Sequence, residues 1–422
     1  MANHYAWLSS FKASLPFAAF TFWLLAFPMA GPLQDPDRLT NPLLAFLVPH
    51  ILTLLLLAFR FPEKHRHLSG ITCGCCLLAA AAPLLYWLSP SLSVPALLLA
   101  GIGGGGFAVR SGALLAQANK PVAAACWSLV TANLMLLVLI NLPVGYAAKL
   151  CLTAAIPLAT MLPALPPQKS ASLRPLWNYL PYVLLYHVVS GLLYGYLLPL
   201  YQQEAWLNGS ELFIYCLFII AATALFPSKP TVVLFAGFAC ALTTCWFIYV
   251  PAVPGVNLGM WMVQAAAGFI DLFLVALLVT QVNPGQSFAL GCAVLCSGVL
   301  GGVFFVELFG AQSRFLVFSE SIVLNLAALA LFIFKRPLPL ESHTKNEQTG
   351  SLVPQEIYQL LSERENEVLG CVLQGHPYRE VAEEMNISES TVKTYMNRIY
   401  QKTETWGKKA LLKSIREAEK KR

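Results

Sequence analysis

Long apolar runs fill most of this chain, and they limit its fold more than any other feature. A helix needs about 20 apolar residues to cross roughly 30 Å of hydrocarbon. Of the 422 residues, 57% are hydrophobic and 11% are charged, whereas soluble domains are about 25% charged. The runs lie near residues 13–30, 43–59, 68–88, 92–118, 121–144, 146–164, 179–200, 211–226, 231–251, 255–280, 285–307 and 315–334. We therefore predict an all-α, multi-pass membrane protein with about twelve spans. The lipid bilayer is one of its expected partners.

Charge divides the chain into domains. Residues 1–336 contain 14 Lys/Arg and 8 Asp/Glu, whereas residues 337–422 contain 13 of each. The stretch 337–354 is rich in Pro, Gly, Ser, Thr and charged residues, as expected of a linker. The composition therefore predicts a transmembrane domain at 1–336, a linker at 337–354 and a polar domain at 355–422.

The basic residues predict the orientation of the spans. An even number of spans places both termini on one side of the membrane. With the N-terminus in the cytoplasm, the cytoplasmic segments hold Lys12, Arg60, Lys64, Arg66, Arg110, Lys120, Lys169, Arg174, Lys229, Lys335 and Arg336, and the other side holds Arg38, Lys149 and Arg314. Because basic residues are enriched on the cytoplasmic side, we predict that both termini are cytoplasmic, in the inner membrane of a bacterial cell.

A weak internal repeat predicts that the membrane domain has two halves. The sequence FPEK at Phe61–Lys64 follows the second span, and FPSK at Phe226–Lys229 follows the eighth, 165 residues later. Two six-helix halves resemble the major facilitator superfamily of transporters, which implies a central cavity near the middle of the membrane. The loop RFPEKHRHLSG (60–70) lies where that family has a signature containing Asp-Arg, and this pair is missing. Proton-driven transport is therefore not expected.

A few polar side chains inside the spans predict a ligand site. Asp271 lies within the tenth span, Arg110 within the fourth, and Tyr186 and His187 within the seventh. Each charged group near the bilayer centre costs about 2.5–3.5 kcal/mol on insertion scales, so such groups usually serve a function. We predict that these four line one cavity for an unknown small-molecule ligand. The alternatives are a structural Asp271–Arg110 ion pair, an Arg110 that reaches the membrane interface, or an interfacial tyrosine belt.

Two other motifs predict packing rather than chemistry. The run GIGGGGFAVRSG (101–112) lacks the Lys-Ser/Thr ending of a phosphate-binding loop, so it favours close helix contact. The eleven cysteines lack the spacing of zinc ligands. No nucleophile–base pair or cofactor loop is evident. We therefore predict no metal, no cofactor and no enzymatic activity.

The polar domain reads as four helices. Ser362 and Glu365 have the spacing of a capping box before the first helix, whose apolar stripe is Val368, Leu369, Val372 and Leu373. A second helix runs from Pro377 to Glu384, with Val381, Ala382 and Met385 facing inward. Asn386 tolerates the left-handed conformation of a tight turn, Ser388 caps the third helix, and the fourth covers 408–418 with Leu411, Leu412 and Ile415 on one side. Helix, tight turn and helix make a helix-turn-helix unit.

The third helix has one apolar face and one face rich in hydrogen-bond donors. At 100° per residue, Val392, Tyr395, Met396 and Ile399 share a face. The opposite face carries Lys393, Thr394, Asn397, Arg398 and Gln401. Residues 337–388 contain three bases and nine acids, whereas residues 389–422 contain ten bases and four acids. A basic C-terminal half suits the phosphates of double-stranded DNA.

The segments LSERENEVLGCVLQG, EVAEEMNIS and STVKTYMNRIYQK resemble the DNA-binding domain of LuxR-type (FixJ/NarL-type) transcription regulators. This resemblance implies that Lys393, Thr394 and Asn397 face base edges in the major groove. It also implies that Ser388, Thr391, Arg398 and Lys402 meet phosphates. The fourth helix of such domains serves dimerisation on paired half-sites, so we expect a homodimer on DNA.

Together these features predict a membrane-integral transcription regulator. Its transporter-like domain would sense a small molecule, and its C-terminal domain would bind DNA. The alternative is a small-molecule transporter with an appended regulatory DNA-binding domain. Accumulation of substrate in vesicles would distinguish the two.

Overall fold

The chain forms two compact units, Met1–Arg336 and Pro337–Arg422. The computed structural model describes residues 2–29, 31–35, 38, 42–60, 65–167, 172–226, 230–250, 253–309, 314–333, 360–373, 376–403, 405 and 411. The predicted linker at 337–354 and most of the predicted fourth helix of the polar domain lie outside these residues.

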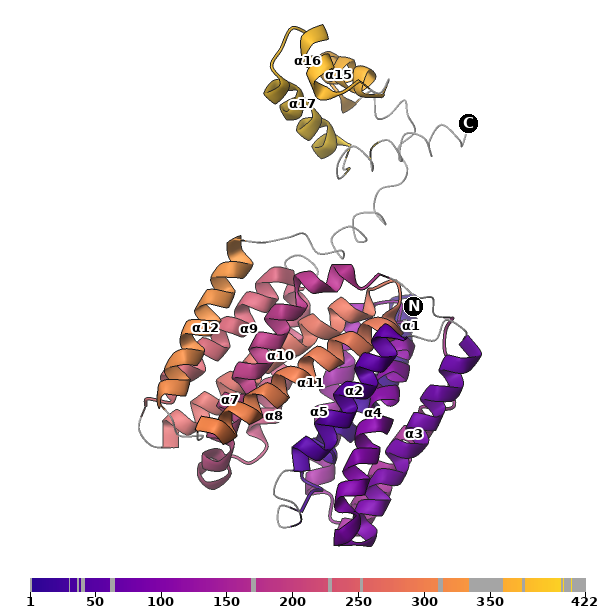
Figure 1. The fold of residues 1–422 in the computed structure, drawn as a ribbon, viewed down its shortest axis with the longest axis vertical. Coiled ribbons are helices and arrows are strands. Elements are labelled where there is room, and N and C mark those ends of the chain that lie inside the picture. Colours follow the sequence, from indigo (N-terminus) through magenta and orange to yellow (C-terminus); the bar gives the residue numbers. More distant parts are fainter. Residues whose placement is uncertain are drawn as a thin grey trace. The chain divides into compact units, whose positions relative to one another are not determined.

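Twelve α-helices form the described part of the first unit (Figure 1), which confirms the predicted number. The first six are α1 (Ala2–Ala26), α2 (Pro42–Phe59), α3 (His65–Leu88), α4 (Ser93–Leu115), α5 (Pro121–Asn141) and α6 (Tyr146–Ala159). The second six are α7 (Leu180–Glu204), α8 (Ser210–Leu225), α9 (Pro230–Phe247), α10 (Val253–Val279), α11 (Pro284–Phe309) and α12 (Arg314–Ile333). Short 3-10 helices precede α4 and α7.

Eight of these helices are long and apolar enough to cross a membrane by length and composition. The other four contain shorter apolar segments, Ser10–Ala26, Tyr146–Ala159, Ser210–Leu225 and Ser321–Leu331. At 1.5 Å of rise per residue, the 14 residues of α6 extend about 21 Å. This helix therefore ends well before a full bilayer crossing, and the chain beyond Ala159 must find other partners for its backbone.

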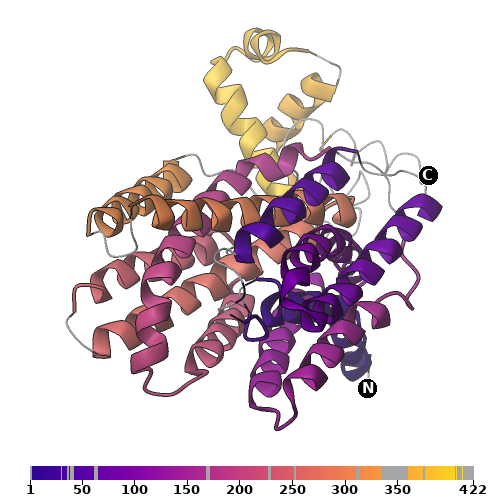
Figure 2. The ribbon, with the colours of Figure 1, turned by 60° about the horizontal axis from the view of Figure 1, so that its bottom comes forward.

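The two groups of six helices pack in the same way. In the first half α4 packs on α2 and α3, α1 on α5, and α3 on α6. The same pairs recur six helices later: α10 on α8 and α9, α7 on α11, and α9 on α12. The halves meet where α2 packs on α11 and where α5 packs on α8. These two contacts are equivalent, because α8 is the counterpart of α2 and α11 is the counterpart of α5. The predicted plan of two six-helix halves is confirmed, and Figure 2 shows them from a second direction.

The glycine run of α4 lets neighbouring helices come into backbone contact. A Cβ atom at Gly101 would lie 2.5 Å from the Phe46 carbonyl oxygen of α2, and one at Gly103 would lie 2.5 Å from the Ala79 backbone nitrogen of α3. Real Cβ atoms do not approach so closely, so side chains larger than hydrogen cannot fit. The predicted packing role of this run is confirmed.

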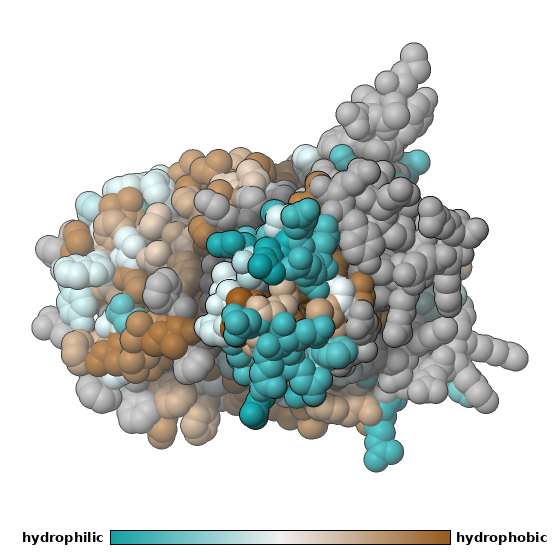
Figure 3. All heavy atoms as spheres, turned by 90° about the horizontal axis from the view of Figure 1, so that it is seen from above, coloured by the Kyte–Doolittle hydropathy of each residue, from teal (hydrophilic) through white to brown (hydrophobic). Residues whose placement is uncertain are grey.

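The second unit contains three helices among its described residues. They are α15 (Glu363–Leu373), α16 (Tyr378–Glu384) and α17 (Glu389–Lys402). Their shared core consists of Leu361, Val368, Leu369, Val372, Val381, Ala382, Val392, Met396, Ile399 and Leu411, with Leu373, Met385 and Tyr395 packed against it. Asn386, between α16 and α17, has a φ of 54°, the left-handed conformation predicted for the turn. Figure 3 colours one face by hydropathy, and among its described residues the hydrophilic ones gather together.

Candidate functional site

The third helix of the C-terminal unit, α17, presents a polar face outside the core. Val392, Met396 and Ile399 are buried, whereas Thr394 and Asn397 are exposed. The Ser388 hydroxyl accepts a hydrogen bond from the Thr391 N–H at 3.1 Å and thereby caps the helix, as predicted. The exposed face and the capped N-terminus are the two features through which a helix can meet the bases and phosphates of DNA.

Two of the predicted base contacts already have partners within α17. The Lys393 ammonium lies 2.8 Å from a carboxylate oxygen of Glu389, four residues earlier. The Thr394 hydroxyl donates to the Ser390 carbonyl oxygen at 2.9 Å. Glu389 therefore places a carboxylate beside the donor-rich face of α17. The hydrogen bond from Lys393 lowers the pKa of the Glu389 carboxyl, so this acid is ionised at neutral pH.

The predicted phosphate contacts Arg398 and Lys402 differ in their surroundings. The Arg398 guanidinium lies 6.0 Å from the centre of the Tyr395 ring, at the limit of a cation–π contact. The Lys402 ammonium lies 2.7 Å from a carboxylate oxygen of Glu365 in α15. Lys402 is thus engaged within the domain, and its contact with phosphate stays a prediction.

Glu365 joins the start of the first helix of the domain to the end of the third. Its carboxylate accepts a hydrogen bond from the Ser362 N–H at 2.8 Å, and the Ser362 hydroxyl accepts one from the Glu365 N–H at 3.4 Å, which confirms the capping box. Burial would raise the pKa of the Glu365 carboxyl, but the hydrogen bonds from Lys402 and Ser362 outweigh it and lower the pKa. The carboxylate therefore remains ionised at neutral pH and keeps the end of α17 fixed against α15.

In the membrane unit, the described partners of Arg110 are backbone carbonyls and not Asp271, and its part in a ligand cavity stays a prediction. Arg110 is buried and donates hydrogen bonds to the carbonyl oxygens of Thr160 at 2.8 Å, Met161 at 2.9 Å and Pro163 at 2.6 Å. These carbonyls follow the early end of α6, where the helix supplies no donors. Within a membrane every backbone polar group needs a partner. Arg110 therefore stabilises the end of a short helix.

The structure does bring the other two predicted residues, Tyr186 and His187, together near Asp271 of α10. One of its carboxylate oxygens lies 3.5 Å from His187 Nε2, and the other accepts a hydrogen bond from the Tyr215 hydroxyl at 2.8 Å. The Tyr186 and His187 rings meet edge to face with centres 5.1 Å apart. We refer to Asp271, His187, Tyr186 and Tyr215 as the Asp271 cluster.

A backbone hydrogen bond orients the His187 ring of the Asp271 cluster. His187 Nδ1 lies 2.8 Å from the Val183 carbonyl oxygen, which can only accept, so Nδ1 carries a proton. The other ring nitrogen, Nε2, faces the Asp271 carboxylate at 3.5 Å.

Tyr215 was missed by the sequence analysis. It lies inside the apolar run of α8, where a tyrosine is most simply explained as part of the core. Because Tyr215 precedes Asp271 by 56 residues, no sequence spacing indicates that the two side chains are in contact. Only the packing of α8 on α10 brings the hydroxyl to the carboxylate.

Comparison with protein families identifies the C-terminal unit. Residues 359–413 match the family described as bacterial regulatory proteins, luxR family. This segment contains α15, α16 and α17 with the turn at Asn386. The unit is therefore a LuxR-type helix-turn-helix DNA-binding domain.

Comparison with solved structures identifies the fold of the membrane unit. The human organic anion transporter MFSD10 (TETRAN) matches with a TM-score of 0.53 and 16% identity, over 77% of this chain and 99% of that one. A bacterial homologue of the iron transporter ferroportin, outward-facing with soaked iron, gives 0.56 and 14%, over 78% and 99%. The major facilitator superfamily transporter FucP in the outward conformation gives 0.51 and 15%, over 77% and 98%. No curated protein matches the chain by sequence.

The chain is therefore a fusion of a multi-pass membrane domain, with the fold of major facilitator superfamily transporters, to a LuxR-type DNA-binding domain. Neither the family found nor the fold found is that of an enzyme.

Proposed function

We propose that the protein is a membrane-integral transcription regulator that binds DNA while its N-terminal domain stays in the bilayer. The observation that carries this proposal is a LuxR-type domain, with an exposed donor-rich face on α17, at the end of a chain with twelve apolar helices. The excess of basic residues on one predicted side of the spans supports a bacterial inner-membrane location with both termini in the cytoplasm, where DNA is found. The fourth helix would pair two domains on DNA.

Replacing Lys393 by alanine should weaken specific DNA binding by about 1–3 kcal/mol, because one donor to a base edge or phosphate is lost. The measurement is fluorescence anisotropy of purified full-length protein with a DNA site that it selects from random sequence. We expect the same loss at Asn397, whose exposed amide can pair with adenine.

Arg364→Ala is the matched control for this experiment. Arg364 is an exposed base of α15 that pairs with Glu367 at 2.8 Å, just as Lys393 pairs with Glu389 at 2.8 Å. Both variants lose one positive charge and one ion pair, but only one changes the face of α17. Equal affinities of the two variants would show that α17 does not read DNA.

We further propose that the Asp271 cluster couples a small-molecule ligand to DNA occupancy. Asp271 is held by groups from α7 and α8, so a ligand that replaces His187 or Tyr215 would change how these helices contact α10. A ligand can shift the membrane domain between conformations only if it binds them with different affinity. A partly buried carboxylate shared by three helices would supply such a difference.

Asp271→Asn should abolish the response of transcription to added compounds while it leaves DNA affinity unchanged. The substitution keeps the volume of the side chain nearly unchanged and removes its negative charge. The measurement is a reporter driven by a selected DNA site, across a panel of amines, acids and sugars. Glu211→Gln is the control, because Glu211 also accepts a hydrogen bond from a tyrosine, Tyr201, at 2.8 Å. A reporter that still responds in Asp271→Asn would exclude the cluster from sensing.

Transport is the alternative function, and the likeness of the membrane unit to transporter structures favours it. Under this alternative the Asp271 cluster would bind the substrate in transit, and the DNA-binding domain would report its flux. Substrate accumulation in proteoliposomes would support transport, whereas binding without accumulation would support a sensor.

A further inference from the structure

The last helix of the membrane unit, α12, is packed on one side only. It packs chiefly on α9 and α7, and in Figure 1 it lies at the edge of this unit. Its buried side consists of Leu324, Ala327 and Leu331. Its other side carries exposed apolar side chains, which are Phe318, Ile322, Leu326, Leu329 and Ile333. A continuous apolar stripe of this kind marks a surface that meets lipid or another protein.

One polar side chain interrupts this apolar stripe. Asn325 is exposed and lies about 2 Å along the axis from the centre of α12 (Arg314–Ile333). Its amide nitrogen donates a hydrogen bond to the Ser321 carbonyl oxygen at 2.8 Å. Its amide oxygen accepts no hydrogen bond from the residues that the structure describes. Lipid tails offer no donor, so a polar atom left unpaired at this depth is costly.

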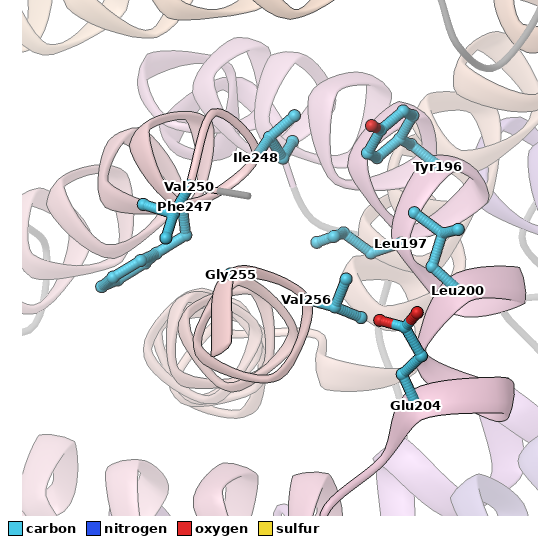
Figure 4. Close-up of a pocket in the computed structure, with 9 residues that line it drawn as sticks. All are labelled: Tyr196, Leu197, Leu200, Glu204, Phe247, Ile248, Val250, Gly255 and Val256. Carbon is cyan, nitrogen blue, oxygen red and sulfur yellow. The ribbon is translucent and has the colours of Figure 1, made fainter. Parts of the chain in front are cut away.

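Other exposed polar side chains of the described helices lie where water can reach them. Asn141 is the last residue of α5, and Glu204 is the last residue of α7, beside the pocket shown in Figure 4. Asn325 is instead eight residues from the nearer end of its helix, a distance of about 12 Å. Its side chain is too short to cover that distance, so the partner of its amide must come from within the membrane.

Asn325 also has the spacing of a contact between paired helices. Phe318, Ile322, Asn325 and Leu329 follow one another at intervals of four, three and four residues. These are the intervals at which side chains line the contact between two supercoiled helices. The four side chains are all exposed, and the row that they form extends about 17 Å along α12.

We propose that α12 is the surface through which two copies of this protein pair in the membrane. A carboxamide has both a donor and an acceptor, so two Asn325 side chains related by a two-fold axis can bond to each other. Both copies have the same orientation in the bilayer, so this axis is perpendicular to the membrane and the two α12 helices are parallel. Asparagine side chains form such hydrogen bonds between membrane helices and stabilise their association. A second copy thus supplies the donor that lipid lacks.

The test measures Förster transfer between donor-labelled and acceptor-labelled full-length protein in liposomes of increasing lipid-to-protein ratio. We expect transfer at high protein density that falls as lipid is added, as a reversible dimer requires. Asn325→Leu keeps a side chain of similar size and removes the amide. It should raise the dissociation constant by roughly tenfold, because the hydrogen bonds between the two amides are lost.

Two tryptophan variants distinguish α12 from the rest of the exposed apolar surface. Leu329 of α12 is 54% exposed, and Leu217 of α8 is 58% exposed. Leu329→Trp should abolish transfer, because the larger ring prevents close approach of two α12 helices. Leu217→Trp is the matched control and should leave transfer unchanged. Thermal unfolding followed by circular dichroism would establish that each variant is folded.

Three results would overturn the proposal. The first is an unmodified protein that stays monomeric at every protein density. The second is an Asn325→Leu variant that pairs as tightly as the unmodified protein. The third is equal transfer in the two tryptophan variants.

The consequence of this pairing for DNA rests on the proposed function. Paired membrane domains keep two DNA-binding domains in one assembly, which raises the effective concentration of the second domain once the first is bound. We therefore expect Asn325→Leu to weaken binding to DNA with two half-sites and to leave binding to one half-site unchanged. The liposome experiment contains no DNA. If the protein pairs there but binds neither DNA, the proposed function fails and the α12 contact stands.

Discussion

Val392→Asp should unfold the C-terminal domain and abolish DNA binding. Val392 is fully buried and packs in the core that joins α15, α16 and α17. An uncompensated buried charge costs about 3–5 kcal/mol. A domain of fewer than about 70 residues rarely has more than roughly 3–5 kcal/mol of stability. Hydrogen–deuterium exchange of full-length protein should therefore show α15–α17 losing protection while the membrane helices retain theirs.

Thr394→Asp is the matched control, because it places the same charge on the exposed face of α17 two residues later. We expect this variant to keep its protected amides and to lose DNA affinity, since the new carboxylate would repel phosphate. Retained protection in Val392→Asp would show that α17 is rotated from the position described for it.

Gly101→Val should strongly destabilise the membrane domain. Its Cβ would lie 2.5 Å from the Phe46 carbonyl oxygen and 3.0 Å from the His50 backbone nitrogen. Backbone atoms cannot move aside unless α2 and α4 separate, so we expect a cost of about 3 kcal/mol or more. The measurement is the midpoint of thermal unfolding of the purified protein in detergent, which should fall clearly.

Gly74→Val provides the comparison for this experiment. Gly74 lies in α3, where an added Cβ would meet nothing within 4 Å. Both substitutions replace a helical glycine by the same residue, so the change in helix propensity is shared. We expect the unfolding midpoint of Gly74→Val to stay close to that of the unmodified protein. Equal midpoints of the two variants would contradict the tight α2–α4 contact.

The sequence was sufficient to predict the helices and the two-half plan. Because a membrane span needs a long apolar segment, the positions of the helices are closely limited by the sequence. Prolines such as Pro42, Pro121, Pro230 and Pro284 also mark the first residues of helices. In the C-terminal domain, Ser362, Asn386 and Ser388 act through local geometry within a few residues. Local rules of this kind can be read without the tertiary structure.

The contacts of the proposed ligand site could be predicted only in part. Asp271 was recognised because an acid inside a span is rare, and Tyr186 and His187 because they share a polar stretch of α7. The hydrogen-bond partners of Arg110 could not be predicted, because they are backbone carbonyls beyond the end of α6 and a sequence does not mark unpaired carbonyls. Side chains brought together by packing between helices leave no spacing pattern, which is why Tyr215 was missed.

The sequence predicted which face of α17 is exposed, but not the ion pairs of its basic residues. The amphipathic pattern of α17 was sufficient to separate its buried and exposed faces, and the described burial agrees with it. The pattern did not reveal that Glu389 pairs with Lys393 or that Glu365 holds Lys402. Contact of Ser388, Thr391, Lys393, Thr394, Asn397, Arg398 and Lys402 with DNA remains a prediction.

The central claim is that the full-length protein binds DNA from the membrane. Its most direct test is chromatin immunoprecipitation through a tag at the N-terminus, which recovers only molecules that retain the membrane domain. We predict discrete genomic sites that disappear in Lys393→Ala but persist in Arg364→Ala. The absence of discrete sites, or their recovery only with a C-terminal tag on a fragment that lacks the membrane domain, would contradict the account.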